Sequence, residues 1–277
     1  MRIVLVIIAI VVGAGTAALI AGTSKWSSAT KNHVAELASS SSAAPAVFDS
    51  RTVEDLPAPV ARYFRTVLRD GQPIVRSAVV LQDAEFFING AWRPLLATQH
   101  FTTAPPGFVW DARIEMAPLL AASVRDSYIR GRGGMQASMF GVYSIVDQAD
   151  IPELNAGALQ RYLAEVVALP TALLPSTAVS WSARDDRSAL ATLRDGAVMV
   201  SLVFEFDDQG LATRITGERF KENSGTYSRQ PWQVQCGDYA ERGGMLIPLR
   251  CEVAWVGPNG AESYWRGRTT SIEYRYN

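Results

Sequence analysis

Short stretches of alternating apolar and polar residues, separated by turn sequences, run through the chain from residue 74 onward. The clearest turn, Asn89-Gly90, separates IVRSAVVLQDAEFFI from AWRPLLATQHFT, and a loop of this type favours an antiparallel hairpin. Asp195-Gly196 and residues 208–210 divide a later stretch in the same way. Strands that follow one another through local turns pair mainly antiparallel. The sequence therefore predicts an α+β fold, mainly antiparallel β, with helices confined to an edge or one face of the sheet.

The first residues of the chain have a different character. Residues 3–22 form an uncharged run of 20 residues, and a helix of about 20 apolar residues can cross the hydrocarbon layer of a membrane. Both a transmembrane segment and a cleaved signal peptide fit this run. The small residues of a cleavage site fit best at Thr16-Ala17-Ala18, inside the apolar run, so we expect an uncleaved anchor.

The chain is expected to have three parts. The anchor takes residues 1–24, a flexible tether rich in Ser and Ala takes residues 25–52, and a single β-rich domain takes residues 53–277. Within the domain, residues 56–68 have apolar side chains at helical spacing after early prolines, which predicts a short amphipathic helix.

The charges that flank the apolar run give only a weak indication of its orientation. Arg2 lies on one side of the run, and Lys25 and Lys31 lie on the other. We favour an N-terminus inside the cell, which would place the domain on the extracytoplasmic side of the cytoplasmic membrane after a single pass. Trp26 would then be an interfacial residue just past the span.

A second helix is predicted over residues 157–175, GALQRYLAEVVALPTALLP. Its apolar stripe consists of Leu159, Tyr162, Leu163, Val166, Val167 and Leu169. Arg161 and Glu165 lie one turn apart on the opposite side, which favours a solvated face, since such pairs are common and stabilise a helix by only about 0.3–0.5 kcal/mol. The alternative is a pair that faces the sheet or a cavity. Its expected partners are Asp126 and Arg113, and it would then fix the helix to the sheet.

Several classes of chemistry lack the residues that they need. The net charge of −1 and a pI near 6.2 give no basic field for nucleic acid. With only His33 and His100, a site made of several histidines is impossible, and no metal site is expected. The sequence has no G-x-S-x-G element, and residues 131–135, GRGGM, do not have the spacing of a nucleotide-binding loop. No cofactor is therefore expected.

Two cysteines flank a predicted turn. If Gly243-Gly244 lies in the turn of a hairpin, Cys236 and Cys251 face each other across the two strands. A cross-strand disulfide would then be geometrically possible. Two separate buried thiols are an equally weighted alternative.

Charged and aromatic residues alternate along two strands. Asp111 and Arg113 share one face of their strand and Trp110 lies on the other, while Asp126 and Tyr128 share a face of the next strand. A solvated side of the sheet is the favoured interpretation. In the functional alternative, these charges line the mouth of a concave pocket.

The order of several motifs resembles that of an uncharacterised bacterial family, known only as a domain of unknown function. These motifs are LPAPVARYF (56–64), PGFVWDARI (106–114), DSYIRGRG (126–133), RYLAEVVALPTALLP (161–175), VSW (179–181) and YW (264–265). The family is similar in fold to the lipoprotein carriers LolA and LolB. This resemblance implies a curved antiparallel sheet or incomplete β-barrel, plugged by a helix, around an apolar cavity, and it carries no catalytic residues.

The leading hypothesis is a membrane-anchored, extracytoplasmic binding or hand-over module for a lipid or other apolar ligand. The candidate ligand-binding residues are Trp110, Asp111, Arg113, Asp126, Tyr128, Arg161, Glu165, Phe204 and Trp265. One alternative is a metal-independent enzyme that uses the carboxylates and arginines of this set in a pocket. Another is a purely structural envelope protein. The expected partner is the lipid bilayer, contacted through residues 3–22.

Overall fold

The structure is a computed structural model that describes residues 2–39, 46–118 and 120–276, with side chains from residue 17 onward. Its strands are β1 (Ser77–Ile88), β2 (Ala91–Thr103), β3 (Pro106–Ala117), β4 (Leu120–Ile129), β5 (Arg132–Met139), β6 (Tyr143–Ala149), β7 (Val179–Asp185), β8 (Ser188–Asp195), β9 (Val198–Phe206), β10 (Ala212–Asn223), β11 (Thr226–Arg242), β12 (Met245–Gly257) and β13 (Gly260–Arg275). Its helices are α1 (Arg2–Ala38), α2 (Ala58–Val67) and α3 (Pro152–Glu165), with short 3-10 helices η1 (Ser50–Val53), η2 (Val166–Ala168) and η3 (Pro170–Leu173). The predicted α+β class is confirmed.

All the strands belong to one 13-stranded antiparallel sheet, in the order β6-β5-β4-β3-β2-β1-β13-β12-β11-β10-β9-β8-β7. The chain therefore forms two series of neighbouring strands, β1–β6 and β7–β13, which are joined where β1 pairs with β13. The predicted hairpin at Asn89-Gly90 connects β1 to β2. Both turn residues have positive φ, at 52° and 79°, which this turn type requires and which Gly adopts without strain.

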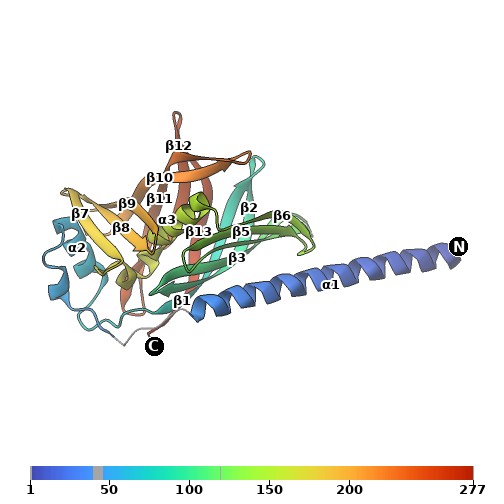
Figure 1. The fold of residues 1–277 in the computed structure, drawn as a ribbon, viewed down its shortest axis with the longest axis horizontal. Coiled ribbons are helices and arrows are strands. Elements are labelled where there is room, and N and C mark those ends of the chain that lie inside the picture. Colours follow the sequence, from blue (N-terminus) through green and yellow to red (C-terminus); the bar gives the residue numbers. More distant parts are fainter. Residues whose placement is uncertain (1, 40–45, 119, 277) are drawn as a thin grey trace.

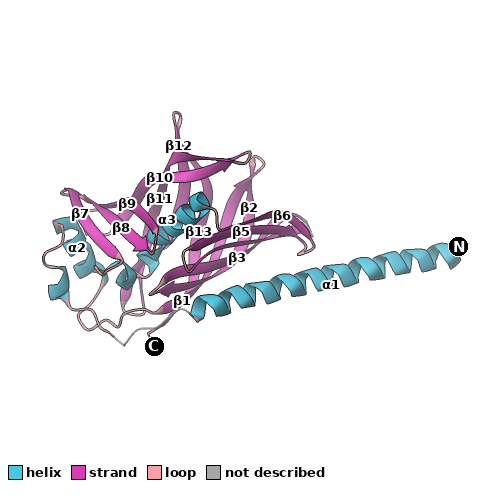
Figure 2. Cartoon of the chain, viewed as in Figure 1, coloured by secondary structure: helices cyan, strands magenta, loops and turns pink. Residues whose placement is uncertain are grey.

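The sheet curves around α3. This helix contacts β3, β4 and β5 on one half of the sheet and β9 and β10 on the other half, although these strands are far apart in the strand order. Figures 1 and 2 show α3 between the two halves. A curved antiparallel sheet with an internal helix is therefore present.

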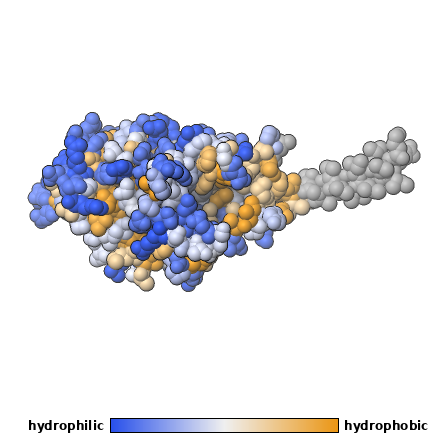
Figure 3. All heavy atoms as spheres, turned by 90° about the horizontal axis from the view of Figure 1, so that it is seen from above, coloured by the Kyte–Doolittle hydropathy of each residue, from blue (hydrophilic) through white to orange (hydrophobic). Residues whose placement is uncertain are grey.

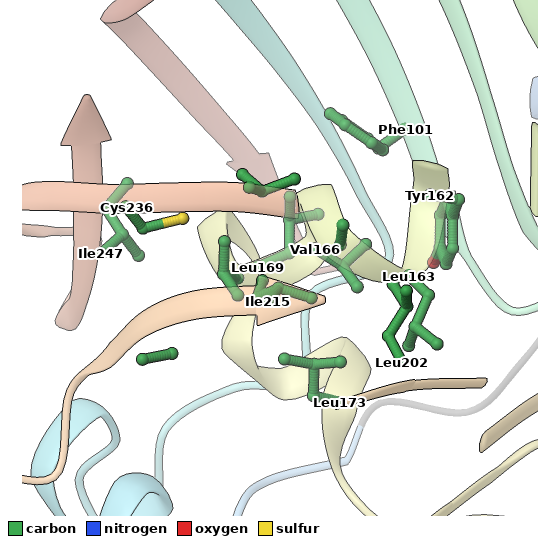
Figure 4. Close-up of a cluster of buried hydrophobic side chains, with 14 of the residues drawn as sticks. Phe101, Tyr162, Leu163, Val166, Leu169, Leu173, Leu202, Ile215, Cys236 and Ile247 are labelled. Atoms are coloured by element: carbon green, nitrogen blue, oxygen red, sulfur yellow. The ribbon is translucent and has the colours of Figure 1, made fainter. Parts of the chain in front are cut away.

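The core lies where α3 and the segments after it meet the inner face of the sheet. Figure 4 shows Leu163, Val166, Leu169 and Leu173 packed beside strand residues such as Ile215. The sequence predicted one continuous helix to residue 175, but α3 gives way to η2 and η3 around Pro170, whose ring cannot continue an α-helix.

The helix α2 covers another part of the core with aromatic side chains. Tyr63 and Phe64 are completely buried, and their rings lie 5.4 Å from Phe206 and 6.3 Å from Trp181, respectively. This confirms the predicted amphipathic helix. The inner face of the sheet thus has a helix packed against it at more than one place.

The helix α1 corrects the predicted tether. Residues 25–38 were assigned to a flexible segment, but they continue α1 and contact the outer side of β2, β3 and β4. Leu37 is buried there against Val109 and Ile129. A segment rich in Ser and Ala can be helical when a few larger side chains along it are buried, which its composition alone did not reveal.

Trp26, predicted to be an interfacial residue, is instead bound to the domain. Its indole N–H donates to Asp111 over 2.8 Å, and the guanidinium of Arg125 lies 4.3 Å from its ring centre. Of the predicted span 3–22, residues 3–16 lie outside the residues whose side chains are described. No helix within the described part of the chain combines the length and apolar character needed to cross a bilayer.

Candidate functional site

Arg161 and Glu165 point into the curved sheet, where they take part in a hydrogen-bonded network. Nη1 of Arg161 donates to Asp126 over 2.5 Å, and its Nε donates to Glu165 over 2.6 Å. The amide of Gln99, on β2, donates to the other oxygen of Glu165 over 2.6 Å. The side chains of Arg161 and Asp126 are only 17% and 13% exposed. The favoured interpretation, a solvated face, is therefore wrong, because the sheet encloses the helix on more than its apolar side.

The network continues along the inner face of β1 and β3. The indole N–H of Trp110 donates to Gln82 over 2.8 Å, and the amide of Gln82 donates to Gln99 over 3.4 Å. The guanidinium of Arg161 lies 4.9 Å from the ring centre of Trp110, so the network has both hydrogen bonds and a cation–π contact.

Arg161 is the cation of this network. Burial alone would lower the pKa of Arg161, but the carboxylates of Glu165 and Asp126 outweigh it, so its pKa lies above the ordinary value. One cation therefore serves two carboxylates, and both acids accept hydrogen bonds from it. The predicted pairing with Asp126 is confirmed. The pairing with Arg113 is wrong, because strand alternation puts Arg113 on the outer face of β3, where it is exposed.

The remaining predicted residues do not join this network. Asp111 lies on the outer face, bound to Trp26. Tyr128 is buried, and its hydroxyl donates to Asp195 on β8 over 2.9 Å, which connects the two halves of the sheet. Burial, followed by the charge of Asp195, raises the pKa of Tyr128. Phe204 is fully buried and Trp265 is half-buried, so each contributes mainly to the apolar packing around it.

A second inner group of residues was not anticipated from the sequence. We call Phe86, Arg93, Arg219, Lys221, Trp255 and Tyr264 the aromatic–cation cluster. Phe86 and Arg93 face each other across β1 and β2, and the ring of Phe86 lies 5.7 Å from that of Tyr264. The ring of Tyr264 stacks on Trp255 at 5.8 Å.

Two cations cover the aromatic rings of the cluster. Lys221 Nζ lies 5.1 Å, and the guanidinium of Arg219 5.9 Å, from the ring centre of Trp255. Arg219 also donates to the carbonyl of Gly157 on α3 over 3.2 Å, which ties the cluster to the helix. Within the described residues, no carboxylate lies within ion-pair distance of Arg93, Arg219 or Lys221.

Arg93 also has a hydrogen-bond donor without a partner in the described residues. Its Nε is buried and has no hydrogen-bond partner among the described residues. A buried donor without a partner costs about 1–3 kcal/mol. The cluster therefore has an excess of positive charge and of hydrogen-bond donors, next to half-buried aromatic surface.

The outer face of the sheet has a depression of about 750 Å³ across β9–β13 and β1. Its charged lining residues are Asp83, Glu85, Glu205, Glu252, Arg214, Arg250, Arg266 and Arg268. Two of its cross-strand ion pairs are Arg214 with Glu205 at 2.7 Å and Arg266 with Glu85 at 2.6 Å. Because both signs are equally represented, this surface has no excess of charge for an ionic ligand.

The two cysteines also border this depression. Cys236 and Cys251 face each other in the β11–β12 register, as the turn at Gly243-Gly244 predicted, and their sulfurs are 3.3 Å apart as free thiols. Within the described part of the chain, no group of three or more His, Cys, Asp or Glu residues is arranged to hold a metal ion.

Comparisons with solved structures reveal distant similarity. A lipoprotein-sorting protein domain from Vibrio parahaemolyticus, described as putative and outer-membrane, aligns with a TM-score of 0.39 and 7% identity, over 72% of this chain and 86% of its own. A DUF1329 family protein from Desulfovibrio piger aligns with a TM-score of 0.42 and 7% identity, over 79% of this chain and 93% of its own. A LolA superfamily protein from Nitrosomonas europaea aligns with a TM-score of 0.41 and 11% identity, over 78% of this chain and 92% of its own.

No curated protein matches the chain. The model of one protein family does match, over residues 54–274, which is most of the chain and almost the whole of the β-rich part. The motifs noted in the sequence fall inside this range. The chain therefore belongs to the family of unknown function DUF6920.

Proposed function

We propose that this protein is a membrane-anchored, extracytoplasmic binding or hand-over module for a lipid with an acidic headgroup. The observation that carries the proposal is the aromatic–cation cluster, in which Arg93, Arg219 and Lys221 lie beside aromatic rings without a carboxylate partner in the described residues. In this proposal the cluster receives the headgroup and the first part of the apolar chain.

The chemistry of the cluster supports an amphiphile over a purely apolar ligand. Arginine donors form short, charge-assisted hydrogen bonds with phosphate or carboxylate oxygens, and such a group would satisfy the buried Nε of Arg93. The half-buried rings of Phe86, Trp255 and Tyr264 offer apolar surface to the adjoining part of the ligand.

The membrane anchor is proposed from the first part of the sequence. Residues 3–22 are uncharged, and the backbone of α1 is helical from Arg2 through this run. Twenty helical residues extend about 30 Å, which matches the hydrocarbon thickness of a bilayer. A tethered module of this kind could receive a lipid at the membrane and pass it on without diffusing away.

Native mass spectrometry of the full chain, extracted from its membrane in mild detergent, tests the proposal. The wild-type chain should retain a lipid with an acidic headgroup. The variant Lys221→Gln combined with Arg93→Gln should lose most of it, because the headgroup loses two cationic partners. The matched control, Arg250→Gln with Arg268→Gln, removes two arginines from the outer depression and should retain the lipid.

Two outcomes would contradict the proposal. If the wild-type chain never carries or accepts lipid, a purely structural role in the envelope becomes the better explanation. If the cluster variant and its control retain lipid equally, the ligand is held elsewhere.

The enzyme alternative has no specific support in the geometry. It requires the carboxylates and arginines to converge, but Asp111 and Arg113 lie on the outer face of β3 and Asp126 lies on the inner face of β4. The inner carboxylates already accept hydrogen bonds from Arg161. We therefore propose no reaction.

A further inference from the structure

The turn between β5 and β6 exposes an unusual amount of apolar surface. We call Phe140, Val142, Tyr143 and Ile145 the β5–β6 tip; they are between 37% and 72% exposed. The segment 139–146, MFGVYSIV, contains no charged residue. Large apolar side chains gathered at one projecting turn are uncommon on a protein surface that faces only water, and they point to a contact with another apolar phase.

The tip lies against α1. A Cβ atom added to Gly22 of the helix would lie 2.4 Å from Val142 Cγ2 and 2.7 Å from the carbonyl oxygen of Phe140. A Cβ added to Gly141 would lie 2.3 Å from the carbonyl oxygen of Gly22. The two backbones therefore meet closely where both residues are glycine. Just before this contact, the exposed Leu19 and Ile20 of α1 extend the apolar surface of the tip.

The direction in which α1 leaves the domain is fixed by its contacts further along. Trp26 is held by Asp111 and Arg125, and Arg125 donates to Thr30 Oγ1 through Nε and Nη2. Leu37 is buried against the sheet. Residues 22–38 are therefore attached to the sheet at several points. The apolar run of the helix leaves the domain beside the tip, as Figure 1 shows. On the face seen in Figure 3, apolar patches lie close to the point where the helix leaves.

The charges near this point suit a bilayer surface. Lys25 and Lys31 are exposed on α1, three and nine residues after its apolar run. Basic residues at the end of a span are attracted to anionic phospholipid headgroups, while aromatic residues such as Tyr143 favour the level of the headgroups. The apolar tip and its aromatic ring thus lie beside Gly22, three residues before Lys25 on α1.

We propose that the β5–β6 tip inserts into the interfacial region of the same bilayer that takes residues 3–22. The domain then has a second membrane contact besides its anchor, and this contact fixes its orientation on the membrane. The inference rests on the anchor in the proposed function, but not on the lipid-binding role of the aromatic–cation cluster.

Photo-crosslinking of the full chain in nanodiscs of phosphatidylethanolamine and phosphatidylglycerol tests this contact. Photoreactive benzoylphenylalanine replaces one residue at a time, at Val142 in the tip, at Ile8 in the anchor, or at Met199. Met199 is the matched control, since it is apolar and 55% exposed, close to the 58% of Val142, but lies on the β8–β9 hairpin. Mass spectrometry should detect lipid adducts at positions 8 and 142 and none at position 199.

Each other result overturns the inference in a distinguishable way. Adducts at position 8 without adducts at position 142 would leave the anchor intact and remove the tip from the membrane. Absence of adducts at both positions would remove the anchor as well. Protein–protein crosslinks at position 142 would show that a second copy of the chain covers the tip. Equal adducts at positions 142 and 199 would mean that lipid contact is not specific to the tip.

Discussion

The amide of Gln99, on β2, donates a hydrogen bond of 2.6 Å to Glu165, in the last turn of α3. The other oxygen of Glu165 accepts from Arg161, which also binds Asp126 on β4. The end of the helix is thus connected to two strands of the surrounding sheet, through side chains that are mostly buried. This connection fixes the position of α3 relative to the sheet. The carbonyl of Gly157, in the same helix, accepts a hydrogen bond from Arg219 of the aromatic–cation cluster.

Removing the cation of the network should lower the free energy of unfolding more than removing one of its carboxylates. Arg161→Met leaves Asp126 and Glu165 as two buried carboxylates without a cation, so we expect the free energy of unfolding to fall by about 3–5 kcal/mol. Glu165→Ala leaves Arg161 still paired with Asp126, and a loss of about 1–3 kcal/mol is expected. Chemical unfolding of the full chain in mild detergent measures both values.

An exposed ion pair provides the control for these two variants. Arg214 pairs with Glu205 at 2.7 Å on the outer face, with side chains 47% and 33% exposed. Arg214→Met should therefore cost less than about 1 kcal/mol. If Arg161→Met cost no more than this control, the network would not fix the helix to the sheet.

The cysteine pair should form a disulfide in an oxidising compartment. Cys236 and Cys251 already face each other, so closing the bond requires little movement of the strands. The hydrogen bond with Cys251, together with burial, raises the pKa of Cys236, so spontaneous oxidation at neutral pH should be slow without a catalyst. Chain isolated from the extracytoplasmic side should lack titratable thiols and be more stable by about 3 kcal/mol than its reduced form. Two free thiols in freshly isolated chain would argue against this compartment.

Acidification should destabilise the fold through His100. Burial, followed by the charge of Arg275, lowers the pKa of this histidine, although Asp111 acts in the opposite direction. As the pH falls through about 6.5, the unfolded chain takes up a proton before the folded chain does, so the free energy of unfolding decreases. His100→Gln should reduce this slope in unfolding experiments between about pH 7.5 and pH 5. An unchanged slope would assign the pH dependence to other groups.

The attachment of α1 should depend on Asp111. Asp111→Ala removes the acceptor for the indole of Trp26, so the helix should open more often over residues 22–38. Hydrogen exchange of these backbone amides should become faster. Glu115→Ala is the control, since Glu115 is exposed on the same face of β3 and should leave exchange unchanged. Slow exchange in both variants would mean that Leu37 and its neighbours hold the helix without Trp26.

Local sequence was sufficient for the strands, but not for their arrangement. Asn89-Gly90 and Gly243-Gly244 predicted their hairpins, and with them the facing positions of Cys236 and Cys251, because a short turn fixes the register of the strands beside it. The aromatic–cation cluster could not be predicted in this way. Arg219 and Trp255 lie on neighbouring hairpins, but Phe86 joins them only because β1 pairs with β13, which no local turn encodes.

The error at α3 has a related cause. Helical periodicity identified the apolar stripe correctly, and it implied that the opposite face meets water. In the folded chain the sheet bends far enough to reach that face with Asp126 and Gln99. Curvature of a sheet depends on twist and strand order summed over many residues, so a pattern within one helix contains no information about it.

The pairing of β1 with β13 has a consequence for when the protein becomes functional during synthesis. Every other pair of neighbouring strands in the described sheet is consecutive along the chain and can form as soon as its turn has been made. The β1–β13 pair must wait for the last strand to emerge, and closing so long a loop is slow. Phe86 lies on β1 and Tyr264 lies on β13, so the two halves of the cluster meet only at that moment. In the proposed function, a chain that is still being made would therefore be unable to take up the lipid.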